Sequence, residues 1–271
     1  MDEEIILKRL AFIKYLLNVA NNQSFQPEPI IATSILSFHD ALELFLHLCS
    51  EELDIKAQKF SFLEYWDKLK PELLKRGKKE LTQLESMRRL NKSRVALKHH
   101  GTLPSKLDIE SFRVLANTFF EENCKNVFGI KVKDISLLEL ISYKRVKDYL
   151  QKALELYELP RETEAMANLA IAFEILLRDY EDSKKARHYQ NSPFFFGKHM
   201  TFLSSFSLGL NNDPKLSEFV DSVKESIEAI QKVVKILSLG IDYRRYVRFS
   251  LLTPMTYWIS GRDERHCLKN K

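Results

Sequence analysis

The chain has 271 residues, of which 45% are hydrophobic and 29% are charged, and its formal net charge is +5 at pH 7. This length suits one large domain or two of ordinary size, and the composition excludes disordered and fibrous classes. The N-terminal stretch is acidic and then interrupted by basic residues, unlike a signal peptide, and no later uncharged run is long enough for a membrane span. With only 7 Gly and 8 Pro, the sequence favours an all-α fold with short connections.

The three cysteines, Cys49, Cys124 and Cys267, are widely scattered and odd in number. They are interpreted as reduced thiols, which makes the cytoplasm the expected compartment, with no membrane partner. The sequence has no glycine-rich phosphate loop, no H-E-x-x-H, no paired cysteines and no evident grouping of histidines with acidic residues. We therefore expect no metal and no cofactor.

Apolar residues recur at helical spacing through the first half of the chain, as Phe38, Leu42 and Phe45 illustrate. This periodicity predicts helices over 3–20, 31–53, 60–69, 79–100 and 108–129. Aromatic residues in 60–69 could stack on nucleic-acid bases, but their helical spacing favours the core. His39 and His47 lie on the second of these helices, where an isolated histidine is more often a core or surface residue than a ligand.

The second half of the chain repeats the order of the first. Similar stretches are 8–20 and 144–156, 36–46 and 171–181, 60–69 and 192–203, and 93–104 and 243–254. The extra residues of the second half fit a predicted loop at 204–214. This order predicts an internal duplication, with two related helical bundles at 1–132 and 133–271 packed as an internal pseudo-dimer. Chance similarity between two halves rich in Leu and Lys is the alternative.

Polar residues able to do chemistry gather in one stretch, NKSRVALKHHGTLP, from Asn91 to Pro104. It lies within the segment Lys68–Lys106, which has 12 Lys/Arg and 3 Asp/Glu, a net charge of +9. A focused basic surface is expected for a polyanionic partner; a solvated lysine-rich helix face is the alternative. In the second copy, cations are kept at Arg244 and Arg248, but Phe249 and Ser250 stand in place of His99 and His100.

Arg94 and His99, near the end of a long helix, form the spacing Arg-x-x-x-x-His, and this resembles the HEPN superfamily (higher eukaryotes and prokaryotes nucleotide-binding). The resemblance implies a metal-independent endoribonuclease of a bacterial defence or toxin-type system, with RNA as substrate. It also implies two facing motif copies in a homodimer or internal pseudo-dimer, and an antitoxin or effector protein could be a further partner. The sequence departs from the family at Val95, where a polar residue is common, and at Phe249.

The residue types fit this chemistry. Histidine titrates near neutrality and can move protons at the 2′-hydroxyl and the leaving 5′-oxygen, whereas arginine holds a phosphate and stays charged. We therefore predict His99 and Arg94 as catalytic, and Asn91, Lys98 and His100 as RNA-binding. The products would be a 2′,3′-cyclic phosphate and a 5′-hydroxyl.

Helix geometry sets a condition on this site. Residues five apart on a regular α-helix point about 140° away from each other. His99 can therefore join Arg94 only if the helix loosens before Gly101 or if another motif copy supplies the complement; His100 is the other candidate proton carrier. Two alternatives remain. The basic residues could simply complement the helix dipole, or the chain could be a non-catalytic module that binds RNA, a nucleotide or a protein, as a sensor or scaffold.

Overall fold

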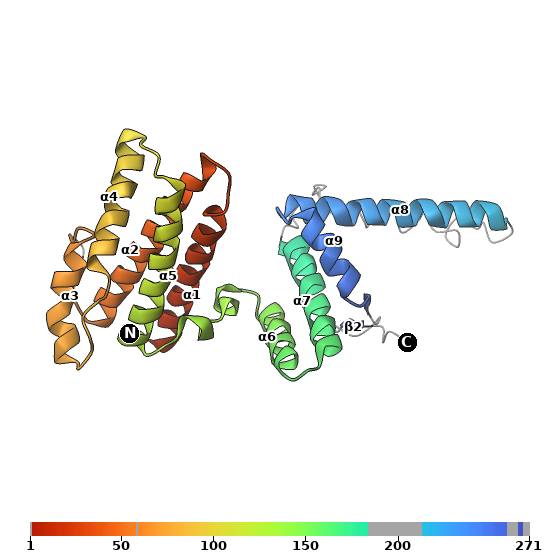
Figure 1. Cartoon of the computed structure of the whole chain (residues 1–271). Coiled ribbons are helices and arrows are strands. Elements are labelled where there is room, and N and C mark those ends of the chain that lie inside the picture. Colours follow the sequence, from red (N-terminus) through yellow and green to blue (C-terminus); the bar gives the residue numbers. More distant parts are fainter. Residues whose placement is uncertain (1, 58, 184–212, 259–264, 268–271) are drawn as a thin grey trace. The chain divides into compact units, whose positions relative to one another are not determined.

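The structure, a computed structural model, describes residues 2–57, 59–183, 213–258 and 265–267. The chain divides into two compact units, Met1–Ser142 and Tyr143–Lys271, whereas the sequence placed the boundary at 132. Regular structure is overwhelmingly helical (Figure 1), which confirms the all-α fold class. Within the described residues the exception is a short antiparallel hairpin of β1 (Thr256–Trp258) and β2 (Arg265–Cys267), which the sequence did not predict.

The first unit is a bundle of five α-helices and three short 3-10 helices (Figure 1). The helices are α1 (Glu3–Gln23), η1 (Ile30–Thr33), α2 (Ser34–Glu52), α3 (Glu64–Lys75), α4 (Leu84–His100), α5 (Lys106–Phe128), η2 (Val132–Asp134) and η3 (Leu137–Leu140). α1 packs along α2, and α2 also contacts α3, α4 and α5. The segment after α5 belongs to this unit because η3 packs on α1, and Lys14 Nζ donates a hydrogen bond to the carbonyl of buried Ile135 at 2.6 Å.

The core of this unit is centred on α2. Phe45 meets Phe119 and Phe120 of α5 edge to face, with ring centroids 5.8 and 5.1 Å apart, an arrangement that aromatic quadrupoles favour. The stretch Ile30–Glu52 is long and apolar enough to cross a membrane by composition alone, but the apolar face of α2 is buried inside the bundle. A core helix of a globular protein passes the same test of length and composition, so this stretch is weak evidence for a membrane span.

α4 begins at Leu84, five residues later than the periodicity predicts. The preceding residues are held instead by side chains of α5. Asn126 accepts a hydrogen bond from the Lys79 N–H and donates one to the Lys79 carbonyl, and Asn123 Oδ1 accepts one from the Thr82 N–H. Because these contacts satisfy backbone groups that a helix would have used, 79–82 stays non-helical, and α4 starts at a point fixed against α5.

The second unit contains α6 (Lys144–Glu158), α7 (Glu162–Ser183), α8 (Pro214–Ser238) and α9 (Tyr243–Leu252), and α6 packs against α7. Under the predicted duplication, α6, α7 and α9 would correspond to α1, α2 and α4. The predicted repeat matches no stretch of the first half to α8, and within the described residues α9 is followed by the hairpin instead of a helix like α5. The stretch 192–203, which the predicted repeat matches to 60–69, and most of the expected loop at 204–214 lie outside the described residues.

Candidate functional site

The end of α4 is a well-formed helix terminus. Gly101 adopts a left-handed conformation with φ of +65°, its N–H donates to the Leu97 carbonyl at 3.1 Å, and the Thr102 N–H donates to the Ala96 carbonyl at 3.2 Å. This hydrogen-bonding pattern closes a helix without disturbing its last turn. α4 therefore stays regular through His100, and Arg94 and His99 remain about 140° apart. A single copy of α4 does not bring the two predicted catalytic residues together.

Asn91 and Arg94 lie on the half-buried side of α4, facing α2. Asn91 Oδ1 is 3.0 Å from Nε2 of His39, whose residue is 2% exposed. The His39 ring packs against Phe62, with centroids 4.4 Å apart. The side-chain oxygen of Asn91 thus links α4 to α2 across the bundle, and the RNA-binding role of Asn91 stays a prediction.

The charge environment of His39 includes Arg94. Burial, and then the positive charge of Arg94, lower the pKa of His39 below its ordinary value of 6.5, whereas Glu43, the hydrogen bond to Asn91 and Asp40 act in the opposite direction. His39 is therefore neutral at pH 7. A neutral ring that donates from Nε2 to Asn91 Oδ1 must carry its lone pair on Nδ1.

The outward side of α4 is basic and exposed. Lys98, His99 and His100 are all exposed at its C-terminal end. Arg89, Lys92 and Lys98 form no ion pair within the described part of the chain, whereas Arg88 pairs with Glu85 at 3.2 Å. Elsewhere in the basic segment, positive charge is offset locally, as in the pair of Lys70 with Glu80 at 3.0 Å. The three predicted residues 98–100 thus share one solvent-facing helix end.

One cluster of side chains that could hold a metal ion was not identified from the sequence. His39, Asp40 and Glu43 each offer a donor atom, and these atoms all lie within 4.8 Å of one another. The expectation that no histidine and acidic residues gather in this chain was therefore wrong. The spacing of His39 and Glu43, four residues apart on a helix, was the available signal. The fixed orientation of the His39 ring could not be predicted from this spacing, because it depends on Asn91, 52 residues away.

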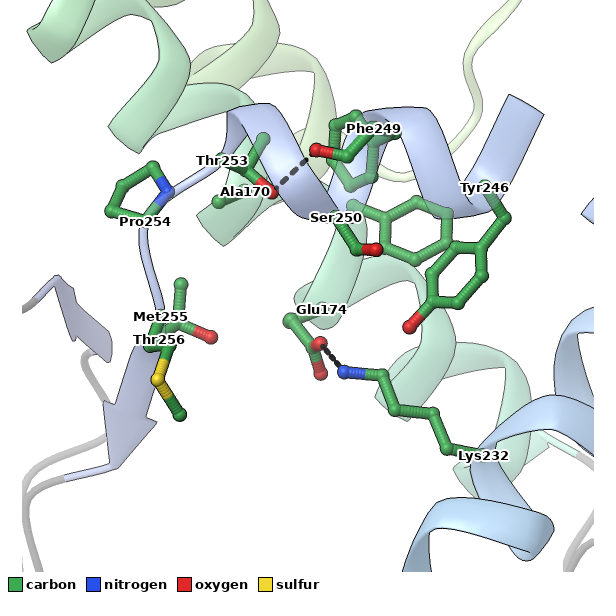
Figure 2. A pocket seen from close by; sticks show the side chains of 11 residues that line it. Ala170, Glu174, Lys232, Tyr246, Phe249, Ser250, Thr253, Pro254, Met255 and Thr256 are labelled. Carbon is green, nitrogen blue, oxygen red and sulfur yellow. Dashed lines mark hydrogen bonds and ion pairs between the residues drawn. The ribbon is translucent and has the colours of Figure 1, made fainter. Parts of the chain in front are cut away.

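The second unit has a cavity of about 280 Å³ between α7, α8, α9 and β1 (Figure 2). Lys232 of α8 donates a hydrogen bond to Glu174 of α7 at 2.7 Å inside it, and Phe249 packs on Phe173 with centroids 5.0 Å apart. Contacts with Glu174 and Tyr246 outweigh burial and raise the pKa of Lys232. Phe249, at the position that the repeat matches to His99, is thus a packing residue.

Comparisons with family models, with curated proteins and with solved structures find no match to this chain. The structure therefore defines the fold class and no protein family. The fold is a helical bundle in the first unit, and the C-terminal end of its helix α4 is basic, carries His99 and His100, and is exposed to solvent.

Proposed function

We propose that the chain is a HEPN-type, metal-independent endoribonuclease of the cytoplasm, active when two copies of α4 come together in a homodimer. The observation that carries the proposal is the division of α4 into two sides. Arg94 is half-buried beside His39, whereas His99 is exposed at the capped end of the same helix. Groups placed on different sides of one rigid helix can serve one phosphate only when another helix supplies the missing partner.

The second unit is a poor source of that partner. Its matching helix α9 carries Phe249, packed on Phe173, where a proton-transfer group would be needed. The relation between the units remains a prediction, but under it a second chain must provide the complementary His99. Exposed apolar side chains close in sequence to the motif support self-association, because Leu103 and Leu107 are 57% and 76% exposed.

In such a dimer His99 of one chain would take the proton from the RNA 2′-hydroxyl and return it to the leaving 5′-oxygen. Arg94 of the partner chain would hold the phosphate and neutralise the charge that develops on its oxygens. Lys98 and His100, exposed on the same helix end, would position the RNA backbone. Asn91, whose Oδ1 is bound to His39, would contact the RNA through its amide N–H groups.

A non-catalytic RNA-binding module is the second candidate, favoured by the open position of the cluster. Lys98, His99 and His100 are exposed on one helix end, and Arg89 and Lys92, which form no ion pair with any described residue, extend the positive charge along α4. Such a surface binds a phosphate backbone without needing a cleft, with strong salt dependence.

The test is cleavage of a labelled RNA pool by the full chain in EDTA, comparing wild type with Arg94→Ala and His99→Ala. We expect cyclic phosphate ends, a loss of about 10²–10⁴-fold for His99→Ala and of about 10²–10³-fold for Arg94→Ala. His47→Ala, which removes a half-exposed histidine of the same unit, is the control and should leave the rate unchanged.

Two results would decide against catalysis. If none of the proteins cleaves RNA although wild type binds it in a salt-dependent way, the chain is a binding module. If His99→Ala and His47→Ala cleave at the wild-type rate, another group moves the proton. An equimolar mixture of Arg94→Ala and His99→Ala should regain part of the activity, because mixed dimers contain one intact combination of the two residues.

A further inference from the structure

We propose that His39, Asp40 and Glu43 of α2 bind a divalent transition-metal ion such as Zn²⁺. The donor set is one imidazole nitrogen and two carboxylates from a single stretch of helix, with all three donor atoms within 4.8 Å of one another. This combination suits borderline first-row metals, with the remaining coordination positions filled by water. The site is separate from the proposed ribonuclease chemistry, which uses no metal.

The distance between His39 and Glu43 fits coordination better than direct contact. His39 Nδ1 lies 3.7 Å from Glu43 Oε2, which is too long for a hydrogen bond. Two ligand atoms at ordinary Zn–N and Zn–O distances around a tetrahedral ion are separated by about 3.4 Å. The pair His47 and Glu51 has the same sequence spacing on the same helix, and its atoms lie closer, at 3.0 Å. Nδ1 of His47 also lacks a hydrogen-bond partner, but the His47 side chain is 45% exposed, whereas that of His39 is 3% exposed.

The buried nitrogen itself points to a ligand. Nδ1 of His39 has no hydrogen-bond partner, although the residue is only 2% exposed. A buried polar atom without a partner is costly, and its presence calls for a group that completes it. Glu43, the neighbour on this side, has a half-exposed side chain, so an ion can approach from solvent while His39 supplies the inner ligand.

The opposite ring nitrogen is already arranged as in metal sites. Histidine ligands usually donate their second N–H to an oxygen acceptor, which fixes the tautomer and the orientation of the ring. His39 Nε2 does so to Asn91 Oδ1 at 3.0 Å.

Arg94 provides an independent electrostatic check. Its positive charge acts on His39 and must therefore oppose a cation bound there. Removing that charge in Arg94→Ala should tighten Zn²⁺ binding, whereas Lys92→Ala, an exposed position on the same helix, should have a smaller effect because it is screened by solvent.

The experiment is Zn²⁺ titration of the full chain by calorimetry, followed by dialysis and metal analysis, with circular dichroism to verify folding. We expect one Zn²⁺ per chain, with affinity lowered more than about tenfold in Glu43→Gln and in Asp40→Asn. Glu51→Gln is the matched control and should bind like wild type. Imidazole ¹⁵N spectra should show Nδ1 of His39 responding to Zn²⁺ while Nε2 stays protonated.

The proposal is overturned if folded wild type binds no Zn²⁺, or if Glu43→Gln and Asp40→Asn both bind it as tightly as wild type. The latter result would place the ion elsewhere, for example on the adjacent His99 and His100. Since no RNA is present, failure here leaves the ribonuclease proposal untouched, and absence of cleavage in EDTA leaves this one untouched.

Discussion

Replacing Asn91 by alanine tests the contact that fixes α4 against α2. The substitution removes the acceptor 3.0 Å from His39 Nε2 and leaves that nitrogen without a partner in a residue that is 2% exposed. An unsatisfied buried polar group costs about 1–3 kcal/mol, and the better helix propensity of alanine offsets about 0.5 kcal/mol of this. We expect the free energy of unfolding of the first unit to fall by about 1–2 kcal/mol, which corresponds to about 3–6 °C in Tm.

The assay follows thermal and urea unfolding by the emission of Trp66, which is buried in the first unit. A Trp258→Phe background removes the second of the two tryptophans, so the signal reports the first unit alone. Lys92→Ala, at an exposed neighbouring position, is the control and should change stability by less than about 0.5 kcal/mol. Equal stability of Asn91→Ala and Lys92→Ala would refute the reasoning, because the hydrogen bond would then contribute nothing.

Three further outcomes are expected. Burial and Arg94 lower the pKa of His39 in the folded chain below 6.5, so below about pH 6.5 the unfolded chain binds a proton at this residue more readily than the folded chain does. The free energy of unfolding, measured in urea, should therefore fall as the pH drops below about 6.5, and His39→Gln should remove that contribution. Gly101→Ala, at φ of +65°, should cost about 1–2 kcal/mol, and Gly101→Asn less, by the same thermal assay. Burial raises the pKa of Cys124 to about 12 and that of Cys49 well above its ordinary value, so native alkylation at pH 8 should be slow at both thiols, as peptide mass spectrometry can show; fast native labelling would mean that the core opens readily.

Local sequence signals determined much of the first unit. The apolar spacing around Phe38 and Phe45 predicted a core helix, and both phenylalanines are fully buried. Gly101 and Gly129 stand at the ends of the helices predicted over 79–100 and 108–129, and both adopt positive φ there. These features depend on residues within a few positions of one another, which is why the periodicity and the helix-stop signals were sufficient.

Features that depend on distant residues were not predictable in this way. The start of α4 is set by Asn123 and Asn126 of α5, some 40 residues further along the chain. The neutral, oriented state of His39 depends on Asn91 and Arg94 of another helix. The same holds for the role of Asn91, since helical spacing placed it beside Arg94 but could not show which group would occupy its side-chain oxygen.

The arrangement of α4 leads to a kinetic prediction that separates catalysis across two chains from catalysis within one chain. If Arg94 and His99 can act only across two chains, the rate of RNA cleavage should rise with the square of the protein concentration below the dimer dissociation constant and linearly above it. Leu107→Glu, which puts a charge at a 76% exposed leucine, should move that change of order to higher concentration if this surface lies in the dimer. Leu74→Glu, at a 52% exposed leucine of α3, is the control. First-order dependence at all concentrations, with a monomer confirmed by sedimentation, would mean that one chain contains the whole site, contrary to the regular helix observed through His100.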